Sequence, residues 1–311
     1  MAYVAVVGAA NVDIGGFPLG RAVPGDSTPG KVRLSMGGVG RNIACNAARL
    51  GLEAQLFTAL GGDLHAELIR ADCARSGVGL DYALQFDDAA TSVYLFIADA
   101  DGDMSLAVND MAIHDRMTVS RLEPLMPALR GASMAVVEAN LPEETIAHLA
   151  QTLEIPVIAD CVSAAKAGRL RAAMPHLDAV KPNRIEAGLL TGVDVTDGAS
   201  ARRAAEALIG MGARRVFLTL GAHGVCCADG ARTLLLPGVP VRMRNATGAG
   251  DAFTAALAWA MRRGLALEET ALAGMAAASI AVESLETVSP GMSEPLLQRR
   301  MDEIKRAMRR L

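Results

Sequence analysis

The chain has 311 residues, a formal net charge of −4, 51% hydrophobic residues and only 3% aromatic residues. This length allows a large core, in one big α/β domain or two modest ones. The composition suits alanine-rich helices packed closely on a sheet better than an all-β fold. The acidic balance argues against a nucleic-acid partner, which would need a clustered basic surface. Basic residues within 299–310 alternate with apolar ones at helical spacing, so we interpret them as a solvated helix face.

Membrane and secretory signals are weak in this sequence. The longest apolar stretch, 271–282, is shorter than the roughly 18–20 residues of a membrane span, and the apolar N-terminus has no basic flank. The five cysteines show no paired metal-ligand spacing, and an odd count suits a reducing compartment. We therefore expect a cytoplasmic protein with neither a membrane partner nor a metal site made of soft ligands.

Short apolar, β-branched runs alternate with longer helical patterns along most of the chain. The predicted strands are 3–8, 54–59, 133–138, 155–160, 179–181, 215–220 and 239–242. The predicted helices are 40–50, 63–76, 142–153, 183–191, 198–211, 249–263, 267–284 and 294–310. This alternation is typical of an α/β fold with a doubly wound, mostly parallel sheet and helices on both faces.

Two regions break this rhythm. Residues 11–36 are rich in glycine and proline and contain a short strand-like run at 31–35. Residues 91–98 and 104–109 are β-rich, with Asp101 and Gly102 as a plausible hairpin turn between them. No helical pattern is available to cover these pieces. We expect a small β-sheet lid, formed by about 11–36 and 91–110 and inserted in a single domain that spans 1–311.

Polar or glycine-rich clusters follow several predicted strands or precede the helices. They are 10–13, 36–42, 182–186, 221–224 and 245–251. Ligands of open α/β sheets bind at the carboxyl ends of the strands. The sequence therefore predicts that these clusters meet at one edge of one sheet.

The run Gly248, Ala249, Gly250 and Asp251 has the sharpest chemical interpretation. Small residues at a helix N-terminus leave backbone N–H groups open to an anion, and the helix dipole adds positive potential there. Phosphoryl transfer needs such donors and a carboxylate that receives the proton of the acceptor hydroxyl. Asp251 could serve as that base, or it could simply cap the helix.

Asn183 and Glu186 begin the helix predicted at 183–191. An amide and a carboxylate one turn apart could hold Mg²⁺-bound water near nucleotide phosphates. The same spacing is that of a capping box, with Asn183 as N-cap and Glu186 at N3. Spacing alone favours the cap.

The glycine run before the helix at 40–50 does not match the dinucleotide-binding fingerprint. Gly37 and Gly38 could let a polyol approach the backbone near Asn42. Asp13 could accept two hydrogen bonds from a vicinal diol, or it could be an ordinary turn aspartate.

The segment 25–31 has the spacing of a phosphate-binding Walker A loop, but we reject it. Val32 stands where Ser or Thr must bind magnesium, and Pro29 removes one donor amide.

Together these residues resemble the ribokinase-like (PfkB) carbohydrate kinases over nearly the whole chain. The strings that carry the resemblance are 37–42 (GGVGRN), 183–186 (NRIE), 219–224 (TLGAHG) and 245–253 (NATGAGDAF). The resemblance implies that Asp251 is the catalytic base and that Gly248, Ala249 and Gly250 form an anion hole. Residues implied to bind substrate are Asn11, Asp13, Gly37, Gly38 and Asn42. Residues implied to bind ATP and its Mg²⁺ are Asn183, Glu186, Thr219, Gly221, Gly224 and Thr247, with Glu186 acting on Mg²⁺ through water.

Further strings resemble a nucleoside-phosphorylating branch of this family. They are 10–13 (ANVD), 29–31 (PGK), 37–44 (GGVGRNIA), 108–111 (VNDM) and 181–186 (KPNRIE). The resemblance implies transfer of the ATP γ-phosphate to the ribose 5′-hydroxyl of a C-linked uracil nucleoside. Asn109 on the lid is a candidate contact for the uracil, since an amide both donates and accepts. Many family members have aspartate near a potassium site where this chain has Asn245, so K⁺ activation is in doubt.

Three alternatives remain open from the sequence. The chain could be a kinase of the same family that acts on ribose, a fructose phosphate or a purine nucleoside. It could be a non-catalytic nucleoside sensor, although the intact 248–251 run argues against that. The interpretation as a Rossmann dehydrogenase has less support, because no well-placed glycine fingerprint with a downstream acidic partner is present. An exposed lid sheet needs cover, which suggests a lid-to-lid homodimer.

Overall fold

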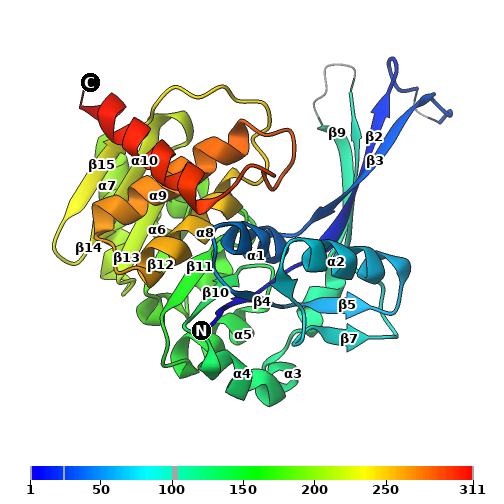
Figure 1. Cartoon of the computed structure of the whole chain (residues 1–311), viewed down its shortest axis with the longest axis horizontal. Coiled ribbons are helices and arrows are strands. Elements are labelled where there is room, and N and C mark those ends of the chain that lie inside the picture. The colour runs from blue at the N-terminus through cyan, green and yellow to red at the C-terminus, as the bar shows by residue number, and fades with distance from the viewer. Residues whose placement is uncertain (1, 24, 100–103, 310–311) are drawn as a thin grey trace.

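Among the residues that the computed structural model describes, 2–23, 25–99 and 104–309, nine strands form one large sheet (Figure 1). Its order is β15 (Thr233–Pro237), β14 (Gly224–Asp229), β13 (Arg215–Thr219), β12 (Ala179–Lys181), β11 (Val157–Asp160), β10 (Met134–Glu138), β1 (Val4–Val7), β4 (Ala54–Phe57) and β6 (Val78–Gly79). All neighbours from β6 to β13 pair in parallel, and β14 and β15 are antiparallel additions at one edge. The predicted doubly wound, mostly parallel fold is confirmed.

Helices cover both faces of this sheet (Figure 1). One hydrophobic core joins α1 (Val39–Arg49), α2 (Leu64–Arg75), α8 (Ala249–Arg262), α9 (Leu267–Val282) and α10 (Glu294–Met308). A second core joins α3 (Val119–Leu122), α4 (Met126–Gly131), α5 (Glu143–Thr152), α6 (Arg184–Thr191) and α7 (Gly198–Gly210). Strand β1 and the first four residues of β10 are continuous apolar runs because both of their faces are buried between these layers.

Four strands form a separate small sheet, which projects from the rest of the molecule (Figure 1). Its order is β3 (Gly30–Gly37), β2 (Asn11–Pro18), β8 (Val93–Ala98) and β9 (Met104–Asp110). The β-rich segments predicted at 91–98 and 104–109 are β8 and β9, while the turn expected at Asp101 and Gly102 lies outside the described residues. A short pair, β5 (Ala59–Gly61) and β7 (Leu84–Phe86), completes the strands.

Some predicted elements are wrong. Residues 239–242 form no strand; Pro240 cannot donate to a ladder, and the segment is largely exposed. The edge of the sheet is instead made by β14 and β15, and the neighbouring Cys226 and Cys227 are buried in β14. Asp13 is not a turn residue, because the glycine-rich 11–18 segment is strand β2. In the described part of the chain no helix has the length and apolar character needed to cross a membrane.

Candidate active site

Helices α1 and α8 bring together two predicted site residues that lie 209 positions apart. Asn42, in the first turn of α1, donates from Nδ2 to Oδ2 of Asp251, in the first turn of α8, over 2.8 Å. The Asp251 carboxyl therefore bonds a side chain of another helix. A simple cap of α8 does not account for that contact.

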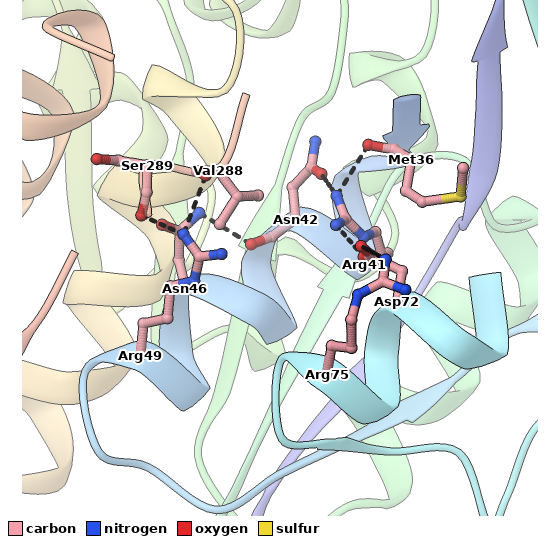
Figure 2. Close-up of polar contacts among 9 residues, drawn as sticks. All are labelled: Met36, Arg41, Asn42, Asn46, Arg49, Asp72, Arg75, Val288 and Ser289. Carbon is pink, nitrogen blue, oxygen red and sulfur yellow. Dashed lines mark hydrogen bonds and ion pairs between the residues drawn. The ribbon is translucent and has the colours of Figure 1, made fainter. Parts of the chain in front are cut away.

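The orientation of the Asn42 amide is set by Arg41, as Figure 2 shows. Arg41 Nη1 donates to Asn42 Oδ1 over 2.8 Å and to the backbone oxygen of Met36 over 2.9 Å. The same guanidinium pairs with Asp72 of α2. Since the amide oxygen of Asn42 is held by a cation, its Nδ2 donor is left to face Asp251.

Burial raises the pKa of Asp251 to about 7. The neighbouring carboxylate of Asp160 raises it further, while the Asn42 hydrogen bond and the charges of Lys181 and Arg41 oppose the rise. A carboxyl with a pKa near neutrality can both receive and release a proton at physiological pH.

A buried ion pair lies beside the first turn of α8. Lys181 Nζ is 2.9 Å from Oδ2 of Asp160, and the Thr254 hydroxyl donates to the same oxygen over 2.6 Å. A Cβ added to Gly250 would lie 2.9 Å from Lys181 Nζ, so the ammonium sits directly against the glycine run. The acidic neighbours raise the pKa of Lys181 above its usual range, which keeps the side chain charged. Sequence reasoning missed both partners, although each ends a buried strand at the predicted edge.

Gly248 is the N-cap of α8 and has a φ of +85°. A side chain at this position would be strained, and it would also collide with the backbone oxygen of Thr287. Gly248 offers no side-chain cap to the helix. The start of α8 therefore has the open amides that an anion site requires.

Asn11 and Asp13 occupy the start of β2, next to Gly37 at the end of β3. Asn11 Nδ2 donates to Asp13 Oδ1 over 2.5 Å, and the Asp13 carboxyl fills the space that a side chain on Gly37 would need. Burial raises the pKa of Asp13, and the Asn11 bond and the charge of Arg41 oppose that rise. Asn109 lies further along the small sheet, on β9, and is exposed.

Asn183 and Glu186 form the capping box that their spacing favours. Asn183 Oδ1 accepts from the Glu186 backbone N–H over 3.0 Å, and Glu186 Oε2 accepts from the Asn183 N–H over 2.7 Å. Glu186 Oε1 takes no part in the box. Thr219 bridges to Asn183, and the turn that follows has positive φ at Gly221 and Gly224. These predicted nucleotide residues are therefore contiguous.

Thr247 is exposed, just before α8, and its backbone N–H donates to Asn245 Oδ1 over 3.0 Å. Asn245 Nδ2 donates to the backbone oxygen of Leu285 over 3.4 Å. A neutral amide thus links the segment before α8 to the segment after α9. That second segment is also tied to α1, because Arg49 donates to the backbone oxygens of Val288 and Ser289 (Figure 2).

Glu138, at the end of β10, is a buried residue that sequence reasoning missed. Its Oε1 accepts from the Ala9 N–H over 2.5 Å and its Oε2 from the Asn140 N–H over 2.7 Å. Complete burial raises its pKa to about 7. Lys166 donates to Asn140 Oδ1 close by. The signal available in the sequence was a glutamate at the end of an otherwise apolar strand. In the structure, Glu138 holds the backbone segment that leads from β1 into β2.

Comparison with known proteins places this site in a family. The sequence model described as pfkB family carbohydrate kinase matches residues 1–294. This chain belongs to the pfkB family of carbohydrate kinases. Among relatives of this pfkB kinase, pseudouridine kinase of Escherichia coli is 33% identical over 294 residues, which cover 94% of each chain.

Solved structures of pfkB kinases and their relatives have the same fold. A carbohydrate kinase from Agrobacterium tumefaciens is 31% identical, covers 97% of both chains and has a TM-score of 0.86. The ribokinase of Arabidopsis thaliana, in complex with ribose and ATP, is 25% identical, covers 96% of this chain and 98% of its own, and has a TM-score of 0.86. A phosphotransferase that acts on a sugar or nucleoside is therefore supported.

Proposed function

We propose that this pfkB kinase transfers the γ-phosphate of ATP to the 5′-hydroxyl of pseudouridine, the C-linked uracil nucleoside expected from the sequence. The observation that carries the chemistry is the Asn42–Asp251 hydrogen bond at the open N-terminus of α8. The similarity to pseudouridine kinase over 94% of the chain supports the choice of substrate.

In this proposal the ribose lies over the start of β2. The Asp13 carboxylate accepts hydrogen bonds from the 2′- and 3′-hydroxyls, with Asn11 fixing its orientation. Gly37 leaves the room that the Asp13 carboxyl fills, and Gly38 lets the chain pass close to the Ala9 backbone, so the sugar would meet Asp13 beside these two glycines. Asn42 holds both the sugar and Asp251. The 5′-hydroxyl is then within reach of the Asp251 carboxylate.

Asp251 receives the proton of the 5′-hydroxyl as this oxygen attacks the γ-phosphorus. The bond to the β-phosphate oxygen breaks, and ADP leaves. The amides of Gly248, Ala249 and Gly250 stabilise the charge on the phosphoryl oxygens. Lys181, packed against Gly250, adds positive potential at the same point. Its buried pairing with Asp160 holds the ammonium in place.

Nucleotide binding is assigned to the contiguous turn of Thr219, Gly221 and Gly224, to Asn183, and to Thr247. Kinases of this fold use Mg²⁺, which neutralises phosphate charge when bound. A single carboxylate suits Mg²⁺ held through water, and Glu186 fits because Oε1 is outside the capping box. In the described part of the chain no group of three or more potential metal ligands surrounds it.

Residues near Asn245 fit a monovalent cation poorly. The amide carries no charge, and its Nδ2 donor points at the Leu285 backbone oxygen, which leaves an N–H group where a cation would require an acceptor. We therefore assign no K⁺ to the working enzyme.

The small sheet acts in this proposal as a lid within a single domain spanning 1–311. Its closure would exclude the water that could otherwise accept the phosphoryl group. Asn109 would then meet the uracil edge. Two copies would pair through their lids.

A substrate panel with coupled ADP detection tests the assignment. Pseudouridine should be turned over with a higher kcat/KM than ribose, fructose 6-phosphate, guanosine or inosine, with the phosphorylated product identified alongside. Faster turnover of ribose would overturn the pseudouridine assignment. Binding of nucleoside without any phosphorylated product would instead indicate a sensor.

A further inference from the structure

Aromatic residues are scarce in this chain, yet three of them share one face of the small sheet. Of six phenylalanines and three tyrosines, Phe17, Phe96 and Tyr94 form one cluster. The Phe17 and Phe96 rings meet edge to face at 5.8 Å, and the Phe96 and Tyr94 ring centroids are 6.0 Å apart. The Arg33 guanidinium lies over Phe17 at 5.0 Å.

Gly15 of β2 lies directly beneath the Phe17 and Phe96 rings. A Cβ at that position would lie 2.6 Å from Cζ of Phe96 and 2.9 Å from Cε2 of Phe17. Both rings therefore pack close to the β2 backbone with their planes 88° apart, and any larger residue at position 15 would block this close approach.

The aromatic face is the one that carries Asp13. Alternate residues of a strand share a face, so Asp13, Gly15 and Phe17 of β2 point the same way. In the strand register, Tyr94 of β8 lies between two neighbours: Asp13 of β2 on one side and Asn109 of β9 on the other. The opposite face of β2, with Val12 and Ile14, packs at its root against the core that includes α1 and α8. The rings are thus free of that core and only partly buried.

We propose that Tyr94 and Phe96, with Phe17 packed edge to face against Phe96, form a platform on which the nucleobase stacks, and that this platform selects nucleosides over free sugars. The inference rests on the proposed function in one respect, the placing of the ribose diol at Asp13. The base is attached at C1′, next to the 2′-hydroxyl carbon, so it lies about one strand spacing from Asp13, roughly 5 Å. That position is over Tyr94 and Phe96.

The surrounding groups suit a uracil. A stacked pyrimidine leaves its edge open, and the Asn109 amide can meet both the N–H donors and the carbonyl acceptors on that edge. Arg33 forms no ion pair among the described residues, so its guanidinium can donate to a uracil carbonyl oxygen. A free pentose would use none of these contacts.

The competing explanation is that the rings only cover the bare face of the sheet. A covering role would affect the folded state and every substrate alike. A stacking role would affect only substrates that carry a base. This difference decides the experiment.

The variants Phe96→Ala, Phe96→Tyr and Tyr94→Leu should be assayed with pseudouridine and with ribose, together with their melting temperatures. Because stacking of a base on an aromatic ring contributes on the order of 10-fold in affinity, Phe96→Ala and Tyr94→Leu should raise KM for pseudouridine by about 10-fold. Their kcat for pseudouridine and both constants for ribose should stay unchanged. Phe96→Tyr retains a ring and should behave as the wild type.

Equal losses on pseudouridine and ribose, or Phe96→Ala with an unchanged KM for pseudouridine, would overturn the platform while leaving the proposed function intact. If the wild-type enzyme prefers a different nucleoside, the same variants are assayed with that nucleoside, and only the pseudouridine assignment fails. A wild-type enzyme that prefers ribose to every nucleoside would overturn both. Where ribose turnover is too slow to measure, Phe96→Ala decides through its other readouts. A higher KM for pseudouridine with unchanged kcat and melting temperature supports stacking, whereas a lower melting temperature with a parallel loss of kcat overturns it.

Discussion

At the scale of single residues, the site depends on two hydrogen bonds that fix the orientation of the Asn42 side-chain amide. The Arg41 guanidinium binds Asn42 Oδ1, and Asn42 Nδ2 binds Asp251. Reversing the amide would set two donors against each other at Arg41 and two acceptors against each other at Asp251. The arginine, which bonds through Asp72 to α2, therefore acts on the proposed base through one intervening side chain.

Replacing the proposed base tests its role directly. Asp251→Asn keeps the shape and can still bond Asn42, but it cannot take up a proton. We expect kcat to fall by about 10³-fold or more, because general-base catalysis contributes on that order, while ATP binding stays largely intact. Asp302→Asn, an exposed change on α10, serves as the matched control. Near-normal turnover of Asp251→Asn would show that the base lies elsewhere.

The pKa of Asp251 predicts a pH profile. The carboxyl must be deprotonated to act as a base, so kcat/KM should fall as the pH drops through about 7. The charge of Asp160 raises this pKa, and its removal also leaves Lys181 unpaired. Asp160→Asn should therefore move the acidic limb to lower pH. The pH dependence of kcat/KM for the two enzymes checks this; a limb that stays in place or moves upward contradicts the electrostatic assignment.

Asn245 gives a third prediction at this scale. Turnover of the wild-type enzyme should be the same in K⁺, Na⁺ and tetramethylammonium chlorides of equal ionic strength, because a neutral amide bonds Leu285. In Asn245→Asp a carboxylate would face that oxygen, and a cation between them would relieve the repulsion. We expect this variant alone to gain activation by K⁺. Strong activation of the wild-type enzyme would contradict the interpretation of Asn245.

At the scale of elements, the start of α6 serves folding and, in our proposal, metal binding with the same residues. Glu186→Gln keeps an acceptor for the Asn183 N–H and so preserves the capping box, but it removes the charge. We expect an unchanged melting temperature and a higher Mg²⁺ concentration for half-maximal activity. Asn183→Ala is the contrasting variant, which removes the cap and should lower stability by about 1 kcal/mol. An unchanged Mg²⁺ requirement in Glu186→Gln would limit Glu186 to the cap.

The elements that sequence patterns predicted well are those whose environment is uniform along their length. Strands such as β1 and β10 are buried on both faces and read as continuous apolar runs. The strand expected at 239–242 failed because Val239 and Val241, on either side of Pro240, imitate such a run. The strand β2 was missed because its glycines suggest turns. Position 15 must be glycine because the Phe17 and Phe96 rings pack against it. No local sequence pattern indicates that contact.

At the scale of the whole molecule, the sequence pointed to the edge of the sheet but not to its interior. The helix starts that carry Asn42, Asp251 and Asn183 were identified as clusters that follow strands. The buried groups that hold them, Lys181 with Asp160 and Glu138 with the Ala9 amide, were not. Their partners come from separate strands, so only the assembled sheet reveals that the charges are paired.

The outer face of the small sheet leads to a prediction about assembly. Its side chains opposite the aromatic cluster are apolar and exposed, among them Val32 (76%), Leu106 (63%) and Val108 (60%). In the described part of the chain no helix covers them, and monomers rarely leave such a patch open. A second copy of the same sheet would bury both patches at once, each Val or Leu contributing about 1.5–3 kcal/mol when fully covered.

We therefore expect the protein to sediment at twice the 32.3 kDa mass of one chain. Val108→Lys places a charge in the centre of the apolar face and should yield monomers, because burying an unpaired ammonium costs more than the neighbouring side chains regain. Leu189→Lys is the matched control. Leu189 is exposed on α6, which packs on the large sheet, so this variant should stay dimeric. Sedimentation equilibrium distinguishes the cases. A monomeric wild-type protein, or a dimer unaffected by Val108→Lys, would mean that something other than a second lid covers this face.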